Sequence, residues 1–117
     1  MQRTLFSVFA ILLAFAPVHA DAPLTAGFAE ADVTPKLGGK KPVYIAGFGH
    51  DRKATGIHDP IMVRALVLEH DRRKIALASI DVVGLFFTNV ESIRSALNGF
   101  DYVLVSSTHN HEGPDTL

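Results

Sequence analysis

Two stretches of the chain carry the apolar pattern of β-strands. Residues 61–69 and 74–83 are rich in apolar and β-branched side chains, and the polar segment 70–73 separates them. This layout predicts two strands joined as a β-hairpin. The second strand is apolar on both faces over residues 75–78, which indicates a strand buried inside a sheet.

A helical pattern follows the hairpin. Thr88 and Glu91 have the spacing of a capping box, in which a hydroxyl and a carboxyl side chain cap the first turn. The next apolar residues recur on one helical face: Val90, Ile93 and Leu97. The Asn-Gly pair at 98–99 then predicts the end of the helix, at about Leu97.

Residues 102–106 predict a third, buried strand, and residues 26–34, which stop at Pro35, predict a further short one. The order strand, helix, strand implies a right-handed crossover between two parallel strands. The expected fold class is therefore α/β, with a mixed sheet and a strand-helix-strand unit. Ligands bind such sheets beyond the carboxyl ends of the parallel strands. Asp81 and the segment after residue 106 are expected to lie there.

The segment after residue 106 carries two closely spaced histidines. One residue separates His109 from His111, so an extended backbone would turn both rings to the same side. Neutral imidazoles placed in this way can bind one metal ion, or a metal ion and a substrate. Four-coordinate zinc needs ligands that this segment cannot supply, and a polar loop with two surface histidines is the alternative.

Two other polar residues are weaker candidates. Asp81 could coordinate a metal, orient a histidine or cap the turn after its strand, and we favour a supporting role or a cap over direct catalysis. His58 lies in a predicted loop, where an isolated histidine most often has no special role.

Composition limits the classes of partner and ligand. The 117 residues are 48% hydrophobic and 20% charged with a formal net charge of −1, which gives no electrostatic reason to expect nucleic acid. Cysteine is absent, so any metal must be held by His, Asp, Glu, Tyr or backbone oxygen.

Residues 1–20 have the layout of a secretory signal peptide. Arg3 precedes an apolar run at 5–16, and Val18-His19-Ala20 places small residues where a signal peptidase reads them. The run of about 12 apolar residues is shorter than the ~20 that a bilayer requires. No transmembrane segment is therefore expected in the mature chain, residues 21–117, which we expect to be secreted or periplasmic.

Five segments in order resemble the start of the catalytic domain of the neutral/alkaline (non-lysosomal) ceramidases. They are residues 27–34, 45–48, 56–58 leading into 64–65, 79–81 and 108–114. The resemblance covers nearly all of the mature chain. It implies that residues 21–117 are the N-terminal part of that domain, truncated after the last motif, and that this chain alone is an incomplete, inactive fragment.

The resemblance also implies an activity. The family hydrolyses the amide bond of ceramide to sphingosine and a fatty acid, with a zinc ion held by the first histidine of the His-x-His motif and by three residues from later in the chain. His109 is then the zinc ligand, and His111 is catalytic, contacting substrate or the bound water. His58 and Asp81 lie in recurring family segments without an assigned role.

One departure from the family bears on the substrate. Glu112 stands where the family commonly has serine, and its charge near the metal could change substrate preference away from ceramide. The alternative to a ceramide-like lipid amidase is a non-catalytic exported domain that keeps the scaffold and binds a metal ion or a partner.

We predict that export cleaves the chain after Ala20, because residues 18–20 follow the apolar run at the spacing of a cleavage site. Intact-mass analysis of the secreted protein is expected to give Asp21 as the first residue. Secreted protein that still begins at Met1 would contradict the assignment.

Overall fold

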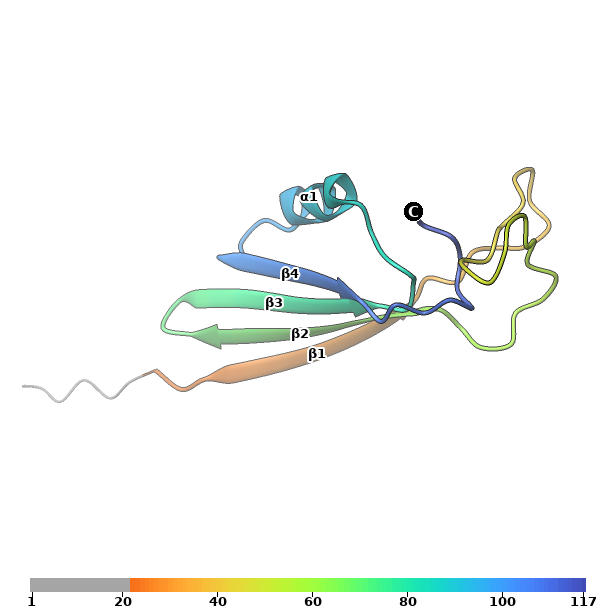
Figure 1. The fold of residues 1–117 in the computed structure, drawn as a ribbon. Helices are drawn as coiled ribbons and strands as arrows, with labels where there is room; N and C mark the ends of the chain where they lie inside the picture. The colour runs from red at the N-terminus through yellow and green to blue at the C-terminus, as the bar shows by residue number, and fades with distance from the viewer. Residues whose placement is uncertain (1–21) are drawn as a thin grey trace, which may run out of the picture.

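The computed structural model of the chain describes residues 22–117, so the predicted signal peptide lies outside the described residues. Four strands and one helix follow one another in the order β1, β2, β3, α1 and β4 (Figure 1). Their bounds are Thr25–Asp32 for β1, Met62–His70 for β2, Arg73–Ile80 for β3, Phe87–Ala96 for α1 and Tyr102–Ser107 for β4. No helix within residues 22–117 has the length and apolar character needed to span a membrane.

The strands form one mixed sheet in the order β1-β2-β3-β4. β1 and β3 are both antiparallel to β2, whereas β3 and β4 are parallel and are connected through α1. The α/β fold class is therefore confirmed. The long loop between β1 and β2 lies at the end of the sheet toward which β3 and β4 point (Figure 1).

The hairpin of β2 and β3 closes through a two-residue turn. His70 pairs with Arg73, and the residues between them, Asp71 and Arg72, have φ angles of 45° and 61°. Positive φ at both central positions is the property of a type I′ turn, whose twist matches that of the flanking strands. The predicted hairpin is confirmed.

β3 ends earlier than the apolar pattern predicts. The strand stops at Ile80, and Val82 N donates a hydrogen bond back to Ile80 O at 3.0 Å. Val82 and Val83 nevertheless remain buried, at 2% and 7% exposure. Their apolar character therefore reflects packing beneath a loop rather than continuation of the strand.

The buried side chains lie on one face of the parallel pair and beneath the loops next to it: Ala46, Ala76, Val82, Val83 and Val103. Ala76 and Val103 are register partners on that face. On the opposite face, register aligns an apolar row: Phe28, Leu66, Leu77 and Leu104. Phe28 is 84% exposed and Leu104 39% exposed, so the prediction of a fully buried strand at 102–106 is wrong for one face of β4.

The predicted capping box is also wrong. The helix begins at Phe87 after Phe86, which has an extended backbone and makes no side-chain cap bond. Thr88 therefore already lies inside the first turn, where it cannot act as N-cap. Glu91 pairs with Arg94 at 3.1 Å instead. The predicted end is confirmed, because α1 stops at residue 96.

We predict that Arg72→Gly stabilises the hairpin. Glycine adopts the positive φ of this turn position without the steric penalty of a side chain, so the free energy of unfolding should rise by about 0.5–1 kcal/mol. Arg73→Gly, one residue later and inside β3, is the control and should lower it by about 1 kcal/mol. Urea denaturation of both variants measures the difference, and a loss of stability in Arg72→Gly would contradict the turn assignment.

Candidate functional site

The parallel pairing of β3 and β4 places two polar segments at one edge of the sheet. The register runs to Ile80 opposite Ser107, so residues 81 and 108 leave the sheet side by side. Thr108 N donates to Ile80 O at 3.0 Å, and Asn110 N donates to Val82 O at 3.2 Å. The segment with the two histidines is therefore fixed to the loop after β3, at the edge where the sequence predicts the site.

The two histidine rings meet at this edge. His109 Nδ1 lies 2.8 Å from Val83 O, and the Nε2 atoms of His109 and His111 are 3.2 Å apart. The rings are nearly perpendicular, with centroids 4.7 Å apart. The expected extended backbone is wrong, because His109 has a φ of 62° and a turn follows it. A left-handed residue rather than strand geometry therefore brings the rings together.

These contacts decide where the protons of the neutral rings lie. A carbonyl oxygen only accepts hydrogen bonds, so Nδ1 of His109 carries the proton that is donated to Val83 O. His109 Nε2 is then the acceptor, and its lone pair receives the hydrogen bond that His111 Nε2 donates. The lone pair of His111 is on Nδ1, which lies against Gly47.

Gly47 provides the space that His111 occupies. Gly47 has a φ of 73°, and a Cβ atom built on it would overlap Nδ1 of His111. The next residue, Phe48, presents its ring edge-on to His111 with centroids 5.5 Å apart. Any side chain at position 47 would therefore displace the imidazole.

Arg52 joins this loop to the histidine segment. Its Nη1 donates to Gly47 O at 2.9 Å, and its Nη2 lies 3.2 Å from Glu112 Oε2. The guanidinium carbon also lies 5.7 Å from the centre of the Phe48 ring. The charge of Glu112, which directly follows His111 in the sequence, is thus paired with an arginine.

Asp81 supports the scaffold. Its Oδ2 accepts hydrogen bonds from Met62 N at 3.3 Å and from Arg64 Nη1 at 3.1 Å. The carbonyl of Asp81 also packs against Gly113, where an added Cβ would lie 2.9 Å from that oxygen. Asp81 therefore ties β2 to the end of β3, and its hydrogen bonds go to β2 rather than to the histidines.

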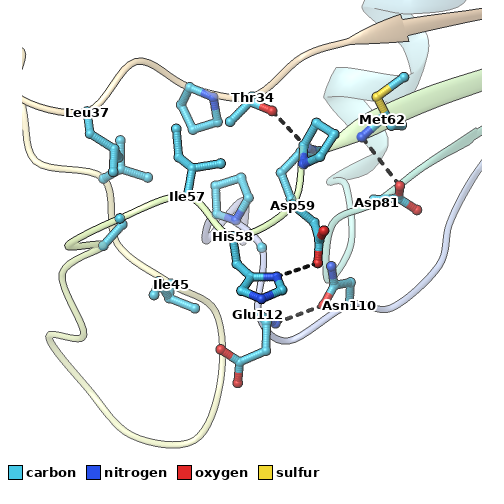
Figure 2. Close-up of a pocket in the computed structure, with 18 of the residues that line it drawn as sticks. Thr34, Leu37, Ile45, Ile57, His58, Asp59, Met62, Asp81, Asn110 and Glu112 are labelled. Atoms are coloured by element: carbon cyan, nitrogen blue, oxygen red, sulfur yellow. Dashed lines mark hydrogen bonds and ion pairs between the residues drawn. The ribbon is translucent and has the colours of Figure 1, made fainter.

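A cavity of about 500 Å³ lies beside the histidine segment, between it and the loop from β1 to β2 (Figure 2). Asn110 and Glu112 line it, whereas His109 and His111 do not. His58 also lines it and is 97% exposed. His58 Nδ1 donates a hydrogen bond to Asp59 Oδ2 at 2.7 Å, and this bond, aided by the charge of Asp59, raises the pKa of His58 above its usual value.

The metal-binding capacity of the described residues is limited. No group of three or more His, Asp or Glu side chains between residues 22 and 117 converges in a way that could hold a metal ion. The histidine pair offers His109 Nε2 as a nitrogen donor, and this atom accepts a hydrogen bond from His111. A catalytic zinc ion takes three protein ligands, which is more than the described residues bring together here.

The sequence predicts the pair of histidines and their place beyond the carboxyl ends of β3 and β4. It gives no role to Gly47, Phe48 or Arg52. Two glycines flank Phe48, which is a local signal for an unusual backbone. The pairing of Arg52 with Glu112 spans 60 residues and leaves no local pattern in the sequence.

No protein-family model matches this sequence, and no curated protein matches it either. Among solved structures, the chain is similar to one described as a ceramidase complexed with C2, with a TM-score of 0.65 and 25% identity over 81% of this chain. The chain spans 16% of the length of that ceramidase chain. The mixed sheet and its helix therefore match one part of a ceramidase fold.

We predict that Gly47→Ala separates His111 from His109. The new methyl group would occupy the place of His111 Nδ1, so the ring must move. Gly38→Ala is the matched control, because Gly38 has a φ of 79° and open space around its Cβ position. Left-handed backbone costs each alanine variant about 1 kcal/mol.

Nuclear Overhauser contacts between the two imidazole rings measure the outcome of this comparison. They should disappear in Gly47→Ala and persist in Gly38→Ala. Persistence of the contacts in both variants would show that Gly47 does not set the position of His111.

Proposed function

We propose that this chain carries part of the active site of a zinc-dependent hydrolase that cleaves the amide bond of ceramide-like N-acyl sphingoid lipids, releasing sphingosine and a fatty acid. The observation that carries the proposal is the tautomer of His109, whose Nδ1–H donates to Val83 O and leaves Nε2 unprotonated, at the carboxyl end of parallel strands in a fold similar to that of a ceramidase. The five sequence segments support a neutral/alkaline ceramidase as the particular class.

The surroundings of His109 fit a metal ligand. Histidines that bind metals almost always donate their second ring N–H to a carbonyl, a carboxylate or a water, which fixes the tautomer and the ring orientation. Val83 O accepts such a bond from Nδ1 at 2.8 Å. Val83 is itself buried, so its carbonyl is held by a packed loop. We propose His109 as a zinc ligand, with the further ligands outside residues 22–117.

His111 is proposed to contact the substrate or the attacking water. Its Nε2 lies 3.2 Å from His109 Nε2, so the His111 ring would lie beside any group bound to that nitrogen. A bound zinc ion would supply Lewis acidity, polarising the amide carbonyl and lowering the pKa of a water. Zinc on His109 Nε2 would replace the hydrogen bond from His111, and the N–H on His111 Nε2 would then orient the carbonyl oxygen or the water, while Gly47 and Phe48 hold the ring.

Lipid amides are proposed as the substrates, and the protein is proposed to act after export. The likeness to a ceramidase supports a lipid substrate. The layout of residues 1–20 supports a secreted or periplasmic location.

We predict that His109→Ala and His111→Ala differ in zinc content. Removing His109 deletes a ligand, so zinc affinity should fall by more than about a hundredfold and hydrolysis should be lost. His111→Ala should retain zinc while hydrolysis falls. His70→Ala, an exposed residue at the end of β2, is the control and should change neither.

Zinc content and hydrolysis of a short-chain N-acyl sphingosine are measured side by side on the full-length exported protein. Full zinc occupancy in His109→Ala would remove the central assignment. Equal zinc loss in both variants would instead make His111 a second ligand.

A further inference from the structure

We propose that Arg52 is a positioning residue for His111. It fixes the loop of residues 46–52 against residues 109–112, and so holds the imidazole in place beside His109. This inference rests on the proposed function only in giving His111 a role at the substrate. The positioning itself follows from the contacts of Arg52.

Arg52 makes two directed contacts to segments that are distant in sequence. Nη1 donates to Gly47 O at 2.9 Å, and Nη2 donates to the Glu112 carboxylate at 3.2 and 3.5 Å. The guanidinium group is planar and rigid, so contacts from both of its terminal nitrogens fix the separation of the two partners. A lysine ammonium is a point charge on a flexible stem and cannot impose the same geometry.

The two segments held in this way enclose the His111 ring. Gly47 lies against its Nδ1, the edge of Phe48 lies across it with centroids 5.5 Å apart, and His109 meets its Nε2. Backbone bonds brace the base of the loop, where Ala46 N donates to Gly113 O at 3.0 Å. The tip of the loop depends on Arg52.

Phe48 is the part of the loop that most needs such support. Its side chain is 78% exposed, and its φ is 54°, a value that bulky residues rarely adopt. Such a conformation persists only when the surroundings hold it. The guanidinium group of Arg52 lies 5.7 Å from the ring centre, a cation-π distance, while its Nη1 holds the carbonyl of the preceding residue.

Because the ion pair of Arg52 and Glu112 is exposed, its loss is expected to change the position of the loop and to leave the stability of the whole fold nearly unchanged. The Glu112 side chain is 65% exposed and that of Arg52 is 30% exposed. Exposed ion pairs contribute little to the stability of a fold. Loss of the pair should therefore release the loop while the sheet remains folded.

Glu112 directly follows His111, so a carboxylate lies next to the ring in the sequence. Pairing with Arg52 directs that carboxylate toward the loop. The contact that holds the loop thus also pairs the charge beside His111 with a guanidinium group.

The decisive measurement is the set of nuclear Overhauser contacts between the Phe48 and His111 rings in the isotope-labelled full chain. We expect these contacts in the parent protein, and their loss in Arg52→Gln and in Glu112→Ala with an unchanged melting temperature. The double variant should resemble Arg52→Gln, because the Glu112 side chain acts through its contact with Arg52. Arg52→Lys should recover the contacts only in part.

Arg73→Gln is the matched control. Arg73 pairs with Asp101 at 3.0 Å, near the opposite end of the sheet from the histidines, and its loss should leave the Phe48 and His111 contacts intact. Retained ring contacts in Arg52→Gln would overturn the proposal. If Arg52→Gln also lowers the melting temperature, the ring contacts in Glu112→Ala decide, since this variant removes the acceptor at position 112 and leaves the Arg52 bond to Gly47 in place.

Enzyme kinetics distinguish failure of the positioning role of Arg52 from failure of the proposed function. In the full-length protein, Arg52→Gln should keep its zinc and its KM within about twofold, while kcat falls by about ten- to a hundredfold, the effect of a misplaced group. If the parent protein neither binds zinc nor hydrolyses the amide, the proposed function fails, and the ring contacts still decide the role of Arg52. Unchanged kcat in an active Arg52→Gln enzyme would overturn the positioning role.

Discussion

The parallel pairing of β3 and β4 is the constraint on which the rest of the site depends. Two strands in parallel register release their following segments at the same edge, and the register here continues to the last residue of each strand. Val83 and His109 can meet only because both lie just beyond that edge. An antiparallel partner would send the histidine segment to the opposite end of the sheet.

Backbone groups contact both imidazoles and orient them. A buried loop carbonyl selects the tautomer of His109, and a glycine leaves room for His111. Neither device orders a long side chain, so neither incurs the loss of side-chain rotamer entropy that such ordering costs. The contact between Arg52 and Glu112 is different, since it must order two flexible side chains that are partly exposed to solvent. The site thus combines a rigid first histidine with a second one whose position depends on a loop.

The sequence predicts those parts of the fold that depend on local patterns. The hairpin, the crossover and the edge that carries His109 follow from apolar runs and turn residues, whose physical effects act over a few positions. The capping box fails because α1 already begins at Phe87, one residue before the hydroxyl of Thr88 that would cap it. The position of Arg52 could not be predicted, because its partner lies 60 residues away and charge pairing has no period.

The left-handed backbone of His109 restricts which residues evolution can place there. Asparagine, aspartate and glycine tolerate such a φ, whereas β-branched and bulky residues do not. A histidine codon becomes an asparagine codon through a single base change. The backbone at position 109 therefore accepts a residue that keeps the left-handed turn and removes the imidazole, and a single base change is enough to place it there.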